Sequence, residues 1–178
     1  MTSADSARTK ALADAVTEIE RHAAEGGWDA PVSVYSLVRT ADLLTANPQL
    51  ADEVPGGAAE DPQHLTSIAQ EGLPEADELE ELLAQLAWPD TVDGAALVVE
   101  RIVLPPQAEE QMPADEQAAV EYSQNHPERD DVRIAVGVLR TGESWCALRS
   151  KSHDSADAVG GGPTAVPGLV QALAATFE

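Results

Sequence analysis

Basic side chains are scarce in this chain of 178 residues, in which ten Lys or Arg stand against 32 Asp or Glu. The formal net charge is −22, and the interval from Thr40 to Glu100 contains no Lys or Arg at all. Nucleic-acid binding depends on Lys and Arg that neutralise phosphates, and an anionic membrane surface repels an acidic protein. We therefore expect neither a nucleic-acid partner nor a membrane partner, whereas a basic protein partner is permitted.

Cysteine and long apolar runs are equally scarce. Cys146 is the only cysteine, which excludes an internal disulfide and a thiolate metal cluster. The longest apolar run, Ala95 to Val99, is far shorter than the roughly 20 residues of a membrane helix. Met1 to Lys10 lack the apolar stretch of a signal peptide. These absences favour a cytoplasmic protein, and nothing in the sequence indicates a metal or another cofactor.

Hydrophobic periodicity alternates between helical and strand patterns along the chain. Helical patterns cover residues 10–25, 41–46, 74–88, 115–124 and 166–177, and strand patterns cover 32–39, 64–70, 95–104, 132–140 and 143–151. Because a tight turn joins the last two strands, we predict an α+β fold with a mainly antiparallel sheet of about five strands. N-terminal, central and C-terminal helices pack against this sheet. We expect residues 1–178 to form a single domain, with residues 1–8 flexible and residues 49–63 and 105–114 in loops.

Two elements near the C-terminus lead to detailed predictions. The last helix has an apolar stripe that we expect to dock on the sheet, formed by Val166, Leu169, Val170, Leu173 and Phe177. The last two strands flank Thr141-Gly142, which we interpret as a two-residue hairpin turn. Counting outwards from that turn places Val138 opposite Trp145 on a bulky face and Gly137 opposite Cys146 on a small face.

Arginines inside predicted strands are the unusual feature of this sequence, which has no dinucleotide fingerprint, phosphate-binding loop, zinc-protease motif or nucleophile elbow. An ionised group in a sheet is costly unless it is paired. Either nearby acids neutralise these arginines, or they recognise an anion together with the following loop. The residues of this candidate anion site are Arg101, Arg149, His153 and Asp154. We assign no catalytic residue and no metal ligand, so a non-enzyme is favoured over an enzyme.

Six short stretches of the chain are distinctive. They are Ala87-Trp88-Pro89, Asp93 to Arg101, Gly137 to Arg140, Cys146 to Arg149, His153-Asp154 and Val166 to Val170. They resemble an uncharacterised actinobacterial family of small acidic cytoplasmic proteins of unknown function, and the likeness runs from Leu12 to Phe177. The resemblance implies a cytoplasmic actinobacterial protein and supplies no site residue. More remotely, the order of helices and sheet is similar to that of small acidic α+β chaperones of secretion systems.

Three functions are compatible with these features. The first is a non-enzymatic, cytosolic protein-interaction domain, adaptor-like or chaperone-like, which binds another protein or a second copy of itself. The second is a small-ligand-binding protein or an enzyme that uses the candidate anion site. The third is an acidic mimic of nucleic acid, which rests on the charge alone. The acidic surface, the missing catalytic motifs and the amphipathic tail favour the first.

Overall fold

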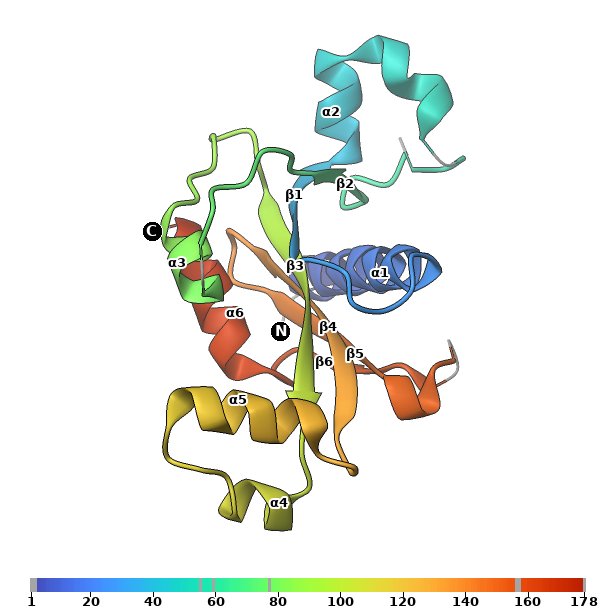
Figure 1. Cartoon of the computed structure of the whole chain (residues 1–178). Coiled ribbons are helices and arrows are strands. Elements are labelled where there is room, and N and C mark those ends of the chain that lie inside the picture. Colours follow the sequence, from blue (N-terminus) through green and yellow to red (C-terminus); the bar gives the residue numbers. More distant parts are fainter. Residues whose placement is uncertain (1–2, 55, 59, 77, 156–157, 178) are drawn as a thin grey trace.

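The computed structural model describes residues 3–54, 56–58, 60–76, 78–155 and 158–177 (Figure 1). In these residues, six strands form one antiparallel sheet in the order β2-β1-β3-β4-β5-β6. The strands are β1 (Ser33–Arg39), β2 (Leu65–Ala69), β3 (Gly94–Val103), β4 (Asp130–Leu139), β5 (Ser144–Ser150) and β6 (Gly160–Gly162). The α-helices are α1 (Ser3–Glu25), α2 (Thr40–Ala46), α3 (Leu79–Ala84), α4 (Pro106–Glu110), α5 (Glu116–Asn125) and α6 (Pro167–Ala174). Short 3-10 helices are η1 (Pro48–Glu53), η2 (Lys151–His153) and η4 (Ala175–Phe177). The predicted α+β fold is confirmed.

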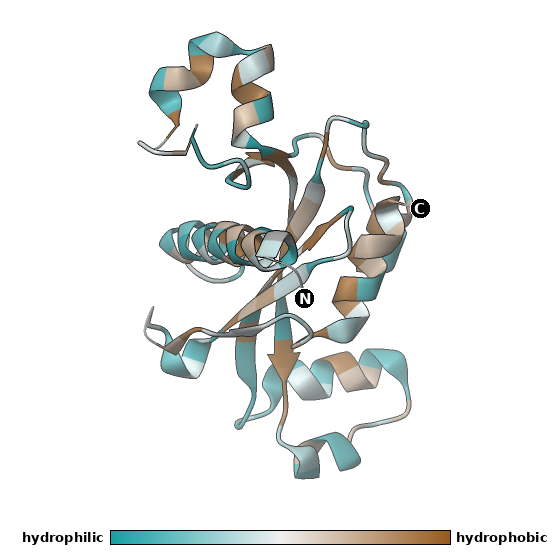
Figure 2. Cartoon of the chain, turned by 180° about the vertical axis from the view of Figure 1, so that it is seen from behind, coloured by the Kyte–Doolittle hydropathy of each residue, from teal (hydrophilic) through white to brown (hydrophobic). Residues whose placement is uncertain are grey.

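Helix α1 covers one face of the sheet (Figure 1). Its apolar residues Leu12, Val16 and Ile19 are buried against small residues of the central strands. The helix can approach β4 closely because Gly137 has no side chain, and a Cβ at that position would lie 2.5 Å from Cγ2 of Val16. Hydrophilic and apolar residues alternate along α1 in Figure 2, as an amphipathic helix over a sheet requires.

Helices α3 and α6 cover the opposite face (Figure 1). Leu169 and Leu173 of α6 are buried in the core there, which confirms the predicted docking of the C-terminal helix. The indole of Trp88 stacks on Phe177 with 5.9 Å between ring centroids, and its Nε1 donates to Thr176 Oγ1 at 2.8 Å. The chain therefore has three layers, with helices on both sides of an antiparallel sheet.

The flexibility expected of residues 1–8 stays a prediction, and α1 begins within this segment, at Ser3. Near this end the guanidinium of Arg8 pairs with Asp5, and its Nε donates to Glu143 Oε1 at 2.7 Å. This contact ties the start of the helix to the turn between β4 and β5. Met1 and Thr2 lie outside the described residues.

Other element boundaries also differ from those predicted. The expected loop 105–114 contains α4, which the Tyr122 hydroxyl anchors by donating to the carbonyl of Ala108 at 2.9 Å. The expected loop 49–63 contains most of η1. The central helix begins only at Leu79, because the backbone of Glu78 is extended, with φ −125° and ψ 150°.

The sheet has a sixth strand where the sequence indicated a loop. Strand β6 consists of three glycines that pair with β5. A Cβ on Gly161 would lie 2.9 Å from the carbonyl oxygen of Cys146 and 3.3 Å from Nε1 of Trp145. Glycine therefore allows this segment to lie against the edge of β5, an effect that a strand propensity does not record.

The predicted register of the β4–β5 hairpin is wrong by one residue. Leu139 N donates to Glu143 O and Gly142 N donates to Leu139 O, both at 2.9 Å, so the turn has three residues rather than two. Gly142 has a φ of +106°, as the bulged end of a three-residue hairpin requires. Gly137 therefore pairs with Trp145 on the α1 face, and Val136 pairs with Cys146 on the α6 face.

In the described part of the chain, no helix combines the length and the apolar character that crossing a bilayer demands.

Candidate functional site

Glu20 lies at the centre of a buried ion cluster beneath α1. Arg149 of β5 donates from Nε to Oε1 of Glu20 and from Nη2 to Oε2 at 3.2 Å. Arg133 of β4, the cross-strand neighbour of Arg149, has its Nη1 3.9 Å from Oε1. Glu20 and Arg133 are each only 1% exposed. An unpaired buried ion costs several kcal/mol, so these three groups stabilise the fold only as a set.

The loop after α1 is fastened to the same arginines. Arg133 donates from Nη2 to the carbonyl of Gly27 at 2.6 Å and lies 4.4 Å from the ring centroid of Trp28. Asp154 accepts from Trp28 Nε1 at 3.0 Å and from Arg149 Nη1 at 3.1 Å. These two hydrogen bonds lower the pKa of Asp154. The hydrogen bonds of Arg149 to Glu20 and Asp154 raise the pKa of its guanidinium.

Glu100 of β3 holds the same loop from the other side. Its two carboxylate oxygens accept from the backbone N–H groups of Asp29 and Ala30, each at 2.9 Å. Asp29 has a φ of +65°, an uncommon conformation for a residue with a side chain, which these bonds stabilise. The charged residues near this loop therefore fix the connection between α1 and β1.

The structure brings together two of the four residues of the candidate anion site. Arg149 and Asp154 are paired with each other, and Nε, Nη1 and Nη2 of Arg149 all donate to carboxylates. His153 lies beside them on η2, where it is exposed and its Nδ1 is 3.0 Å from Ser152 Oγ. Anion binding here stays a prediction, and a ligand would have to displace carboxylates that already occupy these donors.

Arg101 lies apart from that group. In the register of β3 with β4, Arg101 pairs with Val132, whereas Glu100 pairs with Arg133. Since side chains alternate along a strand, Arg101 projects from the face opposite to the ion cluster. It lines a separate, shallow groove of about 430 Å³ with Asp29, Ala30, Glu100, Ile102, Gln124, Arg129 and Asp131.

The importance of Glu20 was not predicted from the sequence. It follows Val16 by four residues and therefore lies on the apolar face of α1. A carboxylate on the core face of a helix, together with strand arginines, is the signal that indicates this cluster. The alternative in which acids neutralise the strand arginines describes Arg133 and Arg149 in the structure.

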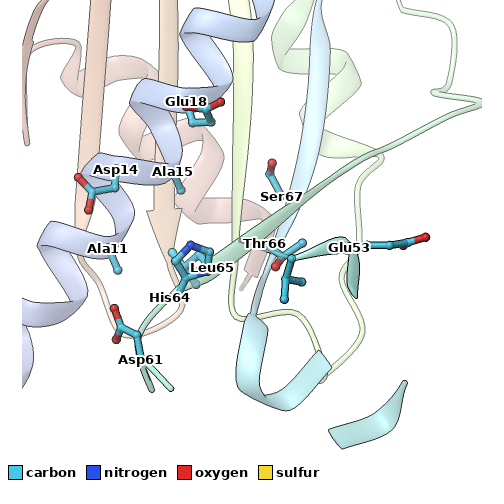
Figure 3. Close-up of a pocket in the computed structure, with 11 residues that line it drawn as sticks. Ala11, Asp14, Ala15, Glu18, Glu53, Asp61, His64, Leu65, Thr66 and Ser67 are labelled. Carbon is cyan, nitrogen blue, oxygen red and sulfur yellow. The ribbon is translucent and has the colours of Figure 1, made fainter. Parts of the chain in front are cut away.

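An acidic cavity lies elsewhere, between α1 and the edge strand β2 (Figure 3). Its volume is about 480 Å³. Four of its lining residues are acidic, namely Asp14, Glu18, Glu53 and Asp61, and none of the described residues that line it is Lys or Arg. The remaining lining residues are Ala11, Ala15, Val54, His64, Leu65, Thr66 and Ser67. In Figure 3 the Asp14 and Glu18 side chains come from α1, and Glu53 lies across β2 from them.

The acidic side chains of this cavity are only weakly compensated. Asp14 pairs with Lys10 at 2.8 Å and Glu18 pairs with Arg21 at 3.2 Å, both on the outer surface of α1. More than half of each of these four side chains is exposed, and exposed pairs of this kind contribute little. Glu20, on the same helix, is by contrast buried and paired with arginines.

Polar contacts fix the start of β2 beside the cavity. The hydroxyl of Thr40, at the start of α2, lies 2.7 Å from Nδ1 of His64 and 2.8 Å from Oγ1 of Thr66. The backbone N–H of Thr40 also donates to the carbonyl of His64 at 2.8 Å. Thr40 is buried, so it orients both the imidazole and the first residues of the strand.

The outer edge of β2 is open. Thr40 N donates to His64 O and Gln70 N donates to Val34 O, so the even-numbered residues of this strand bond to β1. Hydrogen bonding alternates along an antiparallel strand, which directs the N–H and C=O groups of residues 65, 67 and 69 away from β1. Strand β2 is last in the sheet order, and in the described part of the chain no further strand pairs with that side.

Comparison with known proteins places the chain in a family. A family model described as PPA1309-like protein matches residues 12–178. The chain belongs to the PPA1309-like protein family. The match confirms the expectation that the chain belongs to an uncharacterised family. No curated protein and no solved structure matches the chain. The PPA1309-like match includes all six strands, the buried ion cluster and every residue of the acidic cavity except Ala11.

Cys146 is completely buried in the core under α6, so its thiol is out of reach of a substrate. Over the described ranges, no group of three or more His, Cys, Asp or Glu residues is placed to hold a metal ion. In its described residues, this PPA1309-like chain therefore presents an open strand edge beside an acidic cavity.

Proposed function

We propose that this PPA1309-like chain is a non-enzymatic protein-interaction domain that binds a segment of another protein along the open edge of β2. The observation that carries the proposal is that the main-chain groups of residues 65, 67 and 69 point outward and that Leu65 and Ser67 also line the acidic cavity. A peptide that adds a strand to a sheet gains its affinity from such main-chain groups and its specificity from adjacent side-chain pockets.

The sequence of β2 supports this use of the edge. Natural proteins protect exposed edges with Lys, Pro, bulges or inward-pointing charges. Strand β2 has the sequence Leu-Thr-Ser-Ile-Ala and contains no charged residue and no proline. Its Ile68 is 41% exposed, although isoleucine favours burial. An edge without these protections is suited to pairing with another chain.

Several narrower attributes are part of the proposal. An adaptor-like or chaperone-like role requires a bound partner but no reacting group. A cytoplasmic location is part of the proposal, because a chain with a single cysteine suits a reducing compartment. The resemblance described above favours an actinobacterial family of acidic proteins. The small-ligand alternative has less support, because the carboxylates of Glu20 and Asp154 occupy Arg149.

A single proline substitution in β2 tests the proposal. Ser67→Pro removes an N–H that points away from β1, so the ladder to β1 is retained, as in natural edge strands with proline. Ser67→Ala keeps that N–H and is the matched control. We expect a partner that co-purifies with the wild-type chain and the Ser67→Ala variant but not with Ser67→Pro. Hydrogen exchange at the amides of Ser67 and Ala69 should slow when the purified partner is added.

Two results would contradict the proposal. One is a partner that binds the folded Ser67→Pro variant as well as it binds the wild type. The other is a bound partner that leaves hydrogen exchange in β2 unchanged while protecting another surface.

A further inference from the structure

We infer that the segment accepted at the β2 edge is an extended chain in which Lys or Arg alternates with apolar residues. This inference rests on the proposed function and specifies the chemistry of the partner. It follows from the different environments on the two faces of β2.

The α1 face of β2 is acidic. Leu65 packs in the core under α1, so the side chains of residues 65, 67 and 69 share that face. A strand added outside β2 would place every second side chain on the same face, towards the carboxylates of Asp14 and Glu18.

The opposite face of β2 is apolar at its exposed end. The side chains of residues 66 and 68 point there, and Ile68 is 41% exposed. The intervening residues of an added strand would therefore lie beside Ile68. An apolar side chain at these positions would cover exposed apolar surface and contribute through burial.

Charge selects against other occupants of the edge. A second copy of this chain carries a net charge of −22 and would bring its own acidic cavity to the same place. No Lys or Arg occurs between Thr40 and Glu100, so a copy paired through its own β2 would supply no basic residue from that interval. Like charges across an interface are unfavourable, and a basic segment is attracted instead.

Labelled peptides of seven residues, with Lys and Val alternating or with Glu and Val alternating, test the inference by fluorescence anisotropy. We expect the Lys peptide to bind the wild-type protein at low salt and the Glu peptide not to bind. Binding of the Lys peptide should weaken by about tenfold in the Ser67→Pro variant and remain in Ser67→Ala. Added salt should weaken it as well, because the carboxylates are exposed.

A charge-matched pair of variants separates docking from general attraction. Asp14→Asn with Glu18→Gln removes two charges at the cavity. Glu121→Gln with Glu128→Gln removes two exposed charges on or next to α5. The first pair should weaken binding of the Lys peptide severalfold, and the second should leave it within a factor of about two. Equal losses in both pairs would overturn the inference.

The same experiment distinguishes failure of the inference from failure of the proposed function. If the Glu peptide binds and Ser67→Pro abolishes its binding, the edge is a docking site but the partner is not basic. If neither peptide binds, and a co-purified partner is still lost in Ser67→Pro, the inference is wrong and the proposed function stands. If Ser67→Pro has no effect on any ligand, both are wrong.

Discussion

Carboxylates on the same helix, α1, have opposite environments. Glu20 faces the sheet, is 1% exposed, and is matched by Arg133 and Arg149. Asp14 and Glu18 border the cavity beside β2, where no described lining residue is basic. Both groups belong to α1, so helix propensity does not explain the difference. What differs is the element under each side chain: paired central strands under Glu20, and an open edge beside Asp14 and Glu18.

The comparison indicates how the chain distributes its acidic excess. Three of its ten basic residues, Arg8, Arg133 and Arg149, form contacts that hold α1 or the loop after it against the sheet. Strand β2 belongs to the interval from Thr40 to Glu100, which has no basic residue of its own, although Arg39 of β1 pairs with Leu65 at the start of the strand. Charge that the fold requires is therefore compensated internally, whereas charge at the edge is available to a partner.

The largest expected effect is at Glu20. Glu20→Gln keeps the shape of the side chain but removes the buried countercharge of Arg133 and Arg149, and only the more exposed Asp154 still pairs with Arg149. We therefore expect a loss of about 3–5 kcal/mol of unfolding free energy. Urea unfolding followed by circular dichroism measures this loss. The matched variant Glu18→Gln, which is exposed on the same helix, should change stability by less than about 0.5 kcal/mol. Equal losses of unfolding free energy in Glu20→Gln and Glu18→Gln would show that the buried and the exposed carboxylate contribute alike to stability.

Packing of α1 gives a second, smaller contrast. Gly137→Ala would place a Cβ 2.5 Å from Val16 Cγ2 and 2.9 Å from Leu12 Cδ1, so we expect a loss of about 1–3 kcal/mol from overpacking. Ala15→Val adds volume on the side of α1 that lines the cavity and should cost less than about 1 kcal/mol, mainly through helix propensity. Thermal unfolding of both variants tests whether α1 is tight over β4 and loose over β2.

Much of the fold was predictable because burial follows periodicity. The stripe of α6 and the main strands were located from apolar spacing, and the structure places Leu169 and Leu173 in the core as expected. The hairpin register was not, since Thr141-Gly142 is compatible with both two-residue and three-residue turns. The choice depends on the Leu139–Glu143 backbone bonding, which a local pattern does not contain.

The candidate site was less predictable, because tertiary pairing decides it. The sequence identified Arg149 and Asp154 as neighbours but did not indicate that Glu20, 129 residues away from Arg149, would occupy the guanidinium. Arg101 was grouped with them by residue type, although strand alternation in the β3–β4 register separates it. The β2 cavity requires residues of α1 to meet the segments at residues 53–54 and 61–67, so no spacing within one segment reveals it.

The smallest expected effect concerns the outer member of the ion cluster, Asp154. Hydrogen bonds from Trp28 and Arg149 lower its pKa in the folded state, so its ionised form favours folding above its ordinary pKa of about 3.9. This contribution is lost as the pH falls through the lowered value. We therefore expect the urea midpoints of wild type and Asp154→Asn to differ by a constant amount near neutral pH. The difference should shrink at acidic pH, below the ordinary pKa of Asp. A difference that persists unchanged in acid would show that Asp154 acts through its shape and not through its charge. The compensated carboxylates on this face would then comprise Glu20, paired with Arg149, and would not include Asp154.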